Sequence, residues 1–481
     1  MLRPVARRLW HWGAPIAVVV VAAFLRLVNL GHPHQLVFDE TYYVKDAYSM
    51  LHLGFEGAWP SNGDDSFEAG NTDVFTGEPA FVAHPPLAKW LMSLGLLAFG
   101  AQDATGWRIW TAVAGILLVI LTMLVAHRLF RATLLTVIAG GLIAIDGNAI
   151  VLSRVNLLDG TLALFVLLGA YLVLLDRDWS DRRLRAWLAS RQELGLATDW
   201  GPVLWWRPWL ILAGLTFGLA SASKWSGLYV LAAFGIYSVA SDAFLRRHAG
   251  VAFWVSGTVL RQGPVSFLLM VPIAIVAYLA SWIGWFSTEG GYYRHWVEEG
   301  GEAWAGGLAW VPLDWQNWWH FQVAIYNYDI GETTPHGYQA NPLTWLFLTR
   351  PTSMFYENHG DGTASTILDL ANPLIWWAGA AAIGFLVYRV IAGLVRRRGV
   401  WVEAFILTGI AAGYVPWADK LLELDALNPH VAGRLARAMD RWAALAEPYR
   451  SAAREAITRV AAKPDLSNDV REIVSRALEN T

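Results

Sequence analysis

The sequence predicts an all-α polytopic membrane protein with about nine spans and a small soluble helical tail. Of its 481 residues, 56% are apolar and only 16% are charged, and the mean hydropathy is +0.37. A soluble chain carries about 25% charged residues, so this chain lacks the polar surface to cover several soluble domains. The 28 Trp suit the two membrane–water interfaces, where amphipathic rings collect.

Composition also excludes several classes of function. The chain has no Cys, which excludes disulfides, thiolate metal sites and cysteine nucleophiles. Its formal net charge is -3, so the overall electrostatics gives no reason to expect a nucleic-acid partner.

Nine apolar stretches predict the spans, because about 20 mostly apolar residues are needed to cross the hydrocarbon core. Ala14–Leu30 follows Arg3, Arg7 and Arg8 and lacks a small-residue cleavage site, so we expect an uncleaved anchor with a cytoplasmic N-terminus. Leu87–Phe99 is too short to span and is expected to lie at the interface. The other eight predicted spans, two of them short, are Ile109–Ala126, Leu134–Leu152, Leu162–Leu175, Trp209–Ser221, Leu228–Phe244, Val265–Phe286, Pro373–Val395 and Trp401–Trp417.

The arginine clusters predict which ends of the spans face the cytoplasm. Clusters fall at alternate span ends, as the positive-inside rule requires, at Arg128/Arg131, Arg177–Arg191, Arg246/Arg247 and Arg396–Arg398. The opposite ends carry two long outer loops, residues 31–106 and 287–371. A loop as long as the second is usually functional or disordered, and its many aromatic residues favour packing on the membrane domain. We therefore expect the chemistry on the extracytoplasmic face of the plasma membrane.

The composition changes near residue 418. From Asp419 to Thr481, 20 of 63 residues are charged, and Trp442 is the only Trp. Apolar residues in this segment recur at helical spacing among the charges. The chain is therefore divided into a membrane domain, residues 1–417, and a soluble helical tail, residues 418–481.

Asp39 and Glu40 are adjacent carboxylates that directly follow the first span. A partly desolvated carboxylate has a raised pKa and can serve as a general base near neutral pH. The alternative is structural, because Asp is also a favoured residue at the N-cap of a helix.

Six further charged or titratable residues lie at or near the outer ends of predicted spans. They are His84, Lys89, Arg108, Arg154, Asp159 and Lys224. Charges near the membrane are costly and indicate functional sites, and a bound anion is a credible partner for outer arginines and lysines. The alternatives are that Lys89 extends to lipid headgroups and that Arg154 pairs with Asp159. The residues show no metal motif and no glycine-rich phosphate loop, and they leave a requirement for a divalent metal open.

Several motifs in order resemble the protein O-mannosyltransferase family, and the resemblance covers residues 5–417. They are Phe38-Asp39-Glu40-Thr41-Tyr42-Tyr43, His84-Pro85-Pro86-Leu87-Ala88-Lys89, Gly106-Trp107-Arg108-Ile109, Ser153-Arg154-Val155-Asn156-Leu157-Leu158-Asp159 and Lys224-Trp225-Ser226-Gly227. Two later motifs resemble its bacterial branch: Asn341-Pro342-Leu343-Thr344-Trp345 and Thr349-Arg350-Pro351-Thr352-Ser353-Met354.

The resemblance implies a type C glycosyltransferase (GT-C) bundle with an extracytoplasmic active site. The family transfers mannose from a polyprenyl-phosphate mannose donor to Ser or Thr hydroxyls of exported proteins, with inversion and without a covalent sugar–enzyme step. Asp39 and Glu40 match its catalytic position, with Asp39 as the base. Arg108 and Lys224, together with Lys89, are then expected to neutralise the departing lipid phosphate. Expected partners are membrane lipids, secreted Ser/Thr-containing proteins and, as a candidate, the export translocon.

The chain departs from the family after Trp417, where two further spans are expected and the charged tail follows. Asp425–Ala432 and the residues after it resemble the C-terminal end of the M1 aminopeptidase N family. The chain has no HExxH motif, so no peptidase activity is implied. We interpret the tail as foreign to the membrane domain.

Two other functions compete with protein mannosylation. A GT-C enzyme acting on an envelope lipid or glycan would keep the fold and change the acceptor. A non-enzymatic transporter or binding module would use the outer charges to hold a solute, although such proteins often show two related halves and no such repeat is present here.

Overall fold

The computed structural model describes residues 9–331, 347–348, 351–396 and 398–411, together with Arg454, Ile457, Thr458, Ala461 and Leu478. These residues belong to two compact units. Unit 1 lies within residues 1–295 and 353–372, and unit 2 within residues 296–352 and 373–481. The expected tail, residues 418–481, lies outside the described residues except for those five.

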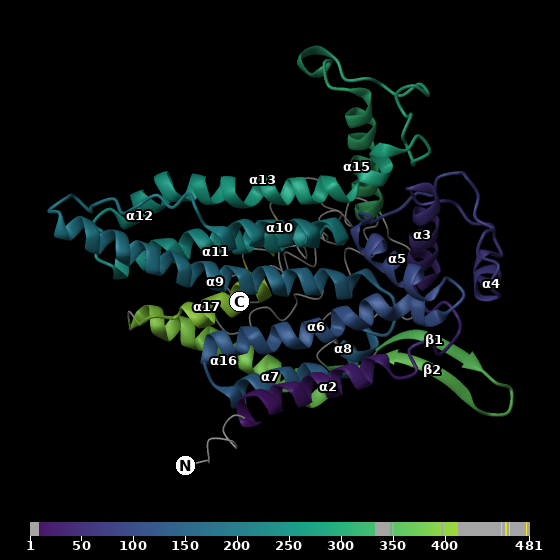
Figure 1. Ribbon diagram of the computed structural model, residues 1–481, viewed down its shortest axis with the longest axis horizontal. Helices are drawn as coiled ribbons and strands as arrows, with labels where there is room; N and C mark the ends of the chain where they lie inside the picture. Colours follow the sequence, from purple (N-terminus) through teal and green to yellow (C-terminus); the bar gives the residue numbers. More distant parts are fainter. Residues whose placement is uncertain are drawn as a thin grey trace. The chain divides into compact units, whose positions relative to one another are not determined.

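Unit 1 is a helical bundle with one β-hairpin (Figure 1). Its elements are η1 Leu9–Gly13, α2 Ala14–Leu27, α3 Glu40–Leu53, α4 Gly63–Glu68, α5 Leu87–Phe99, α6 Ala104–Phe130, α7 Thr133–Ile145, α8 Gly147–Val151, α9 Leu158–Glu193, α10 Pro208–Ser223, α11 Gly227–His248, α12 Trp254–Ser256, η2 Gly257–Gln262, α13 Gly263–Ser281, α14 Ile283–Ser287, β1 Thr352–Asn358 and β2 Ala364–Asp369. The described part of unit 2 contains η3 Gly306–Leu308, α15 Leu313–Gly331, α16 Pro373–Val395 and α17 Trp401–Ala411.

The described helices confirm a mostly helical multi-pass membrane protein, but they do not confirm the count of nine spans. Six are long and apolar enough to cross a membrane: Leu9–Leu27, Ala104–Phe130, Leu158–Glu193, Gly227–His248, Trp254–Ser281 and Pro373–Gly393. The predicted spans Leu134–Leu152 and Trp209–Ser221 correspond to α7 and α10, of 13 and 16 residues. At 1.5 Å per residue, helices of this length fall short of a hydrocarbon core about 30 Å thick. The predicted span Trp401–Trp417 is described only as far as Ala411.

Some predicted bounds were wrong. Leu162–Leu175 was expected as a short span, whereas α9 runs for 36 residues and continues through the arginine cluster to Glu193. Hydropathy ends at the first charges, but the helix continues because Leu184 and Leu188 pack on Leu245 and Val251. Leu134–Leu152 divides at Asp146, whose side chain caps α8 by accepting from the Ala149 N–H.

Two glycines set the closest helix packing in unit 1. A Cβ built on Gly214 would lie 2.4 Å from the Met270 carbonyl oxygen, and one on Gly218 would lie 2.5 Å from the Ala274 carbonyl oxygen. Only glycine lets the α10 and α13 backbones approach this closely, as small residues do in membrane bundles. Figure 1 shows these two helices side by side along most of their length.

The end of unit 1 that carries α3, α4 and α5 is packed with aromatic rings and with the hairpin. Tyr48, Trp59, Phe67 and Trp107 form ring contacts at centroid distances of 5.5–6.3 Å. The hairpin was not predicted, since an all-α fold was expected. Its Met354, Phe355 and Ile367 pack on Val37, Val155 and Leu157. The hairpin therefore buries apolar side chains next to the predicted motifs at residues 38–43 and 153–159.

Candidate active site

Four of the predicted site residues gather at the α3–α5 end of unit 1. Asp39 is at the N-cap of α3, His84 precedes α5, Asp159 begins α9 and Lys224 follows α10. Lys224 Nζ lies 2.9 Å from Asp159 Oδ1, and the charges of both residues act on Asp39 and on His84. Residues from four elements, up to 185 positions apart in sequence, therefore form one polar cluster, which we call the Asp39 cluster.

Asp39 occupies the N-cap position without acting as a cap. Its side chain makes no capping hydrogen bond, and it is half-buried. Desolvation raises the pKa of its carboxyl, while the Lys224 charge and a hydrogen bond from Tyr43 act in the opposite direction. The alternative role as a helix cap is therefore not what the geometry shows, and the carboxylate remains available to accept a proton.

The backbone directly before Asp39 is strained. Phe38 has a φ of +54°, a left-handed conformation that costs a non-glycine residue about 1–2 kcal/mol. The turn is held because the Val37 N–H donates to Glu40 Oε2 at 2.8 Å. Strain that the surroundings maintain in this way is concentrated at functional sites.

Glu40 and Arg108 form a fully buried ion pair beneath the Asp39 turn. Arg108 Nε and Nη2 donate to the two Glu40 carboxylate oxygens, each at 2.8 Å. Glu40 Oε1 also accepts from the Asn156 N–H at 2.8 Å. The remaining Arg108 donors bind the carbonyls of Leu30, Pro33 and Gln35. Both side chains are at most 2% exposed, so Arg108 is bound to protein groups and is not open to an external anion, contrary to the expectation that it meets the lipid phosphate.

Arg154 holds the other side of the same segment. Its guanidinium donates to the carbonyls at the C-terminal end of α2 and just beyond, at 2.9–3.2 Å, namely those of Leu25, Arg26, Val28 and Asn29. Arg154 therefore does not pair with Asp159, which binds Lys224 instead. Arg108 and Arg154 together fix residues 25–40, the segment that presents Asp39.

Lys89 is also committed inside the protein. Its Nζ lies 2.8 Å from Glu56 Oε1 and 3.1 Å from Asp46 Oδ2, and its side chain is 1% exposed. This internal ion pair joins α5 to α3, so the Lys89 ammonium is committed neither to the lipid phosphate that the resemblance implies nor to lipid headgroups, the structural alternative. His84 is only partly buried, and desolvation, with the charges of Lys224 and Lys89, lowers its pKa to about 4.

Two residues that the sequence did not single out contribute to this end. Tyr43 lies one helical turn after Asp39, hydrogen-bonds it, and has its ring centroid 6.4 Å from that of His84. The spacing of four residues between Asp39 and Tyr43, one turn of a helix, was the sequence signal that could have predicted this contact. Arg26 is fully buried and donates to Ser153 Oγ and to the carbonyls of Ala22, Ile143 and Ala144.

Among the described residues, no three His, Asp or Glu side chains are arranged to hold a metal ion. The predicted motif at 341–345 lies outside the described residues, as do Thr349 and Arg350.

Comparisons with known proteins divide the chain as the composition does. Residues 16–198 match the family model "Dolichyl-phosphate-mannose-protein mannosyltransferase", and residues 314–415 match the "C-terminal four TMM region of protein-O-mannosyltransferase". Residues 409–479 match a domain of unknown function described as ARM repeats.

Individual relatives and a solved structure are also similar to the chain. A polyprenol-phosphate-mannose–protein mannosyltransferase of Mycolicibacterium smegmatis is 31% identical over 424 residues, which cover 84% of this chain and 76% of that protein. The aminopeptidase N of Caulobacter vibrioides is 37% identical over 67 residues, 14% of this chain and 8% of that protein. A solved S. cerevisiae protein O-mannosyltransferase complex, bound to the sugar donor, superposes with a TM-score of 0.40 at 18% identity, over 58% of this chain and 34% of that chain.

Proposed function

The chain belongs to the dolichyl-phosphate-mannose–protein mannosyltransferase family of membrane glycosyltransferases, and we propose that it transfers mannose from polyprenyl-phosphate mannose to Ser or Thr hydroxyls of exported proteins. The observation that carries the proposal is the Asp39 cluster. It combines a half-buried carboxylate that makes no helix cap with a partly exposed cation, Lys224, at one end of a membrane bundle.

The proposed reaction is a single displacement. Asp39 accepts the proton of the acceptor hydroxyl as its oxygen attacks the anomeric carbon of mannose. The bond between that carbon and the phosphate oxygen breaks, and its electron pair leaves with the lipid phosphate. Attack opposite the leaving group inverts the anomeric centre. A hydroxyl has a pKa far above 7 and needs a positioned base, whereas the leaving phosphate needs charge stabilisation.

The geometry divides the predicted residues into two roles. Lys224 is the cation left partly exposed beside Asp39, held by Asp159, so we assign it to the leaving phosphate. The low pKa of His84 keeps its imidazole neutral at pH 7, which suits a hydrogen bond to the sugar or phosphate. Glu40, Arg108, Arg154 and Lys89 are assigned to positioning, because their charged atoms bind other protein groups.

The same proposal includes the sidedness and the fold. Lipid-linked donors are confined to the membrane, so an enzyme that uses one must be embedded. We propose a GT-C bundle in the plasma membrane with the Asp39 cluster on the extracytoplasmic face and the N-terminus in the cytoplasm, as the arginine clusters indicate. The proposal also includes the export translocon as a candidate partner of the enzyme.

The decisive experiment supplies purified full-length protein with labelled polyprenyl-phosphate mannose and a choice of acceptors. The expected result is labelled mannose on a Ser/Thr-rich peptide and none on a matched peptide with Ala at those positions. Label on an added envelope lipid or glycan, with the peptide unlabelled, would assign the enzyme to the competing GT-C reaction. Absence of transfer to either acceptor would contradict the proposal, provided that the preparation binds the donor.

A further inference from the structure

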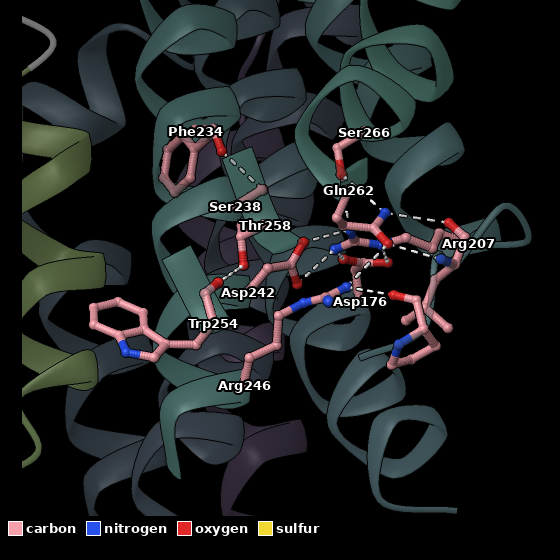
Figure 2. A network of polar contacts seen from close by, with 12 residues as sticks. Asp176, Arg207, Phe234, Ser238, Asp242, Arg246, Trp254, Thr258, Gln262 and Ser266 are labelled. Atoms are coloured by element: carbon pink, nitrogen blue, oxygen red, sulfur yellow. Dashed lines mark hydrogen bonds and ion pairs between the residues drawn. The ribbon is translucent and has the colours of Figure 1, made fainter. Parts of the chain in front are cut away.

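The opposite end of unit 1, where α9 and α11 finish and α12 begins, contains a buried charge network (Figure 2). Arg207 donates from Nη1 to Asp242 Oδ2 at 2.6 Å and from Nε to Asp176 Oδ1 at 3.2 Å. It also donates to Ser266 Oγ at 2.9 Å. All three charged residues are at most 6% exposed, so this network is closed to solvent.

The network fastens the segment 199–207 onto the helices. Arg246 Nη1 donates to the Trp200 carbonyl at 2.8 Å, and Gln262 Oε1 accepts from the Leu204 N–H at 2.7 Å. A Cβ on Gly257 would lie 2.5 Å from the Trp200 carbonyl oxygen, so the backbones touch there as well. Trp200 is therefore held through its own carbonyl, and the Asp199 carbonyl before it accepts from the Phe253 N–H at 2.8 Å.

An exposed arginine is stacked on this fixed ring. The Arg261 guanidinium carbon lies 4.1 Å from the Trp200 ring centroid, and the Phe253 ring lies 5.1 Å from Trp200. Among the described residues, Arg261 forms no ion pair with a carboxylate. A guanidinium oriented by an aromatic face keeps its N–H donors for a planar or tetrahedral anion.

The surroundings of Arg261 are both cationic and apolar. Its neighbours Val259 and Leu260 are 54% and 69% exposed. Exposed arginines at this end outnumber exposed carboxylates, which are Glu193 and Asp199; the arginines are Arg182, Arg183, Arg185, Arg247 and Arg261. Besides Arg261, the arginines Arg183, Arg191 and Arg247 lie over Trp rings at this end, at 5.0–5.2 Å.

The position of the stack in the bundle identifies its neighbour. Phe253 of the stack lies in the turn between the candidate spans Gly227–His248 and Trp254–Ser281, and Arg261, in the first third of the second span, lies over the same Trp200 ring. The turn between two spans lies at the level of the lipid headgroups. An exposed cation beside exposed aliphatic side chains at that level matches a phosphate attached to acyl chains, and anionic leaflets attract such basic clusters.

We propose that the Arg261–Trp200–Phe253 stack is a binding site for the headgroup of an anionic phospholipid, whose acyl chain lies along Val259 and Leu260. The site is at the opposite end of unit 1 from the Asp39 cluster and does not depend on the proposed transfer reaction.

Native mass spectrometry of the full-length protein in detergent tests the site, with dioleoyl-phosphatidylglycerol as the probe and dioleoyl-phosphatidylcholine as the zwitterionic reference. The phosphatidylglycerol should bind more tightly, and Arg261→Gln should weaken it about fivefold, the usual contribution of one arginine at an anionic surface. Trp200→Ala, which keeps the charge and removes the ring, should weaken it similarly. Arg185→Gln is the matched control, because it removes an exposed arginine of the same end that pairs with Asp181 and lies over no ring.

Equal binding of the two lipids by the wild type would overturn the site. So would phosphatidylglycerol binding unchanged in both Arg261→Gln and Trp200→Ala, or weakened as much by Arg185→Gln as by Arg261→Gln. Equal weakening by Arg185→Gln and Arg261→Gln would mean that every exposed arginine of this surface contributes equally to phosphatidylglycerol binding. A melting temperature measured for each variant separates loss of the site from loss of the fold.

Discussion

At the scale of single residues, the proposed chemistry depends on the Asp39 carboxylate. Replacing it by Asn keeps the shape and the hydrogen bond from Tyr43 but removes the base. Transfer should fall about 10²- to 10⁴-fold, the usual contribution of general base catalysis, while the melting temperature stays close to wild type. Initial rates with labelled donor and peptide check this. Wild-type turnover by Asp39→Asn would remove Asp39 from the mechanism.

The pKa shifts predict the shape of the pH–rate profile. A base acts only when deprotonated, and burial raises the pKa of Asp39. The loss of rate on acidification should therefore begin at a higher pH than an ordinary aspartate, with a pKa of about 3.9, would give. His84, with a pKa of about 4, stays neutral over most of this range. Measured kcat/KM between pH 4 and 8 should show the same acid limb in His84→Asn, although at a lower rate. A limb near pH 6.5 that disappears in His84→Asn would assign it to the histidine.

Variants of Arg108 and of Lys224 should differ in their melting temperatures. Removing one partner of a buried ion pair typically costs about 3–5 kcal/mol, so Arg108→Ala should lower the melting temperature as well as activity. Arg108→Lys should not restore it, because a lysine cannot make the paired contacts to Glu40. Lys224→Gln removes a partly exposed pair and should reduce donor use with little change in melting temperature. Equal melting temperatures for Arg108→Ala and wild type would contradict the positioning role.

At the scale of secondary-structure elements, the α10–α13 contact requires glycine. Gly218→Ala places a methyl group against the Ala274 backbone and should destabilise the protein by about 1–3 kcal/mol, the usual cost of overpacking. Gly235→Ala on α11 is the matched control, since a Cβ there meets nothing within 4 Å. The control should be neutral or slightly stabilising because alanine favours helix. Thermal unfolding in detergent measures both. A smaller loss for Gly218→Ala than for Gly235→Ala would mean that the helices separate easily.

The sequence was a good guide to the existence of helices and a poor guide to their ends. Apolar length alone placed α5 at Leu87–Phe99 and α16 at Pro373–Val395, as observed. It failed at α9, where tertiary packing continues a helix through charged residues, and at the β1–β2 hairpin, whose strands pair across an exposed turn without strong alternation.

The site shows a similar division. The residue types and the expected span ends predicted that Asp39, Asp159 and Lys224 lie near one another, because span ends on the same side of a membrane meet at one surface. The partners of Arg108 could not be predicted, since Glu40 is 68 positions away and nothing in the sequence distinguishes a cation that faces a ligand from one that faces a buried carboxylate.

At the scale of the whole molecule, the two ends of unit 1 should lie on opposite sides of the membrane, and the absence of cysteine makes this directly testable. Gly77, in the segment between α4 and α5, and Ser190, in the arginine-rich end of α9, are both exposed. A single cysteine at Gly77→Cys should react with a membrane-impermeant maleimide in intact cells. A cysteine at Ser190→Cys should react only after permeabilisation, because positive-inside bias keeps the α9 arginines in the cytoplasm.

Each cysteine variant is its own control when cells are labelled before and after permeabilisation, since the wild-type chain has no thiol to react. Labelling of Ser190→Cys but not Gly77→Cys in intact cells would invert the orientation and place the Asp39 cluster in the cytoplasm, where exported proteins would meet it before translocation. Labelling of both in intact cells would mean that the segment from α5 to α9 crosses the membrane an even number of times. That outcome would require a recount of the crossings, beginning with α5 and α7, each of which has only 13 residues.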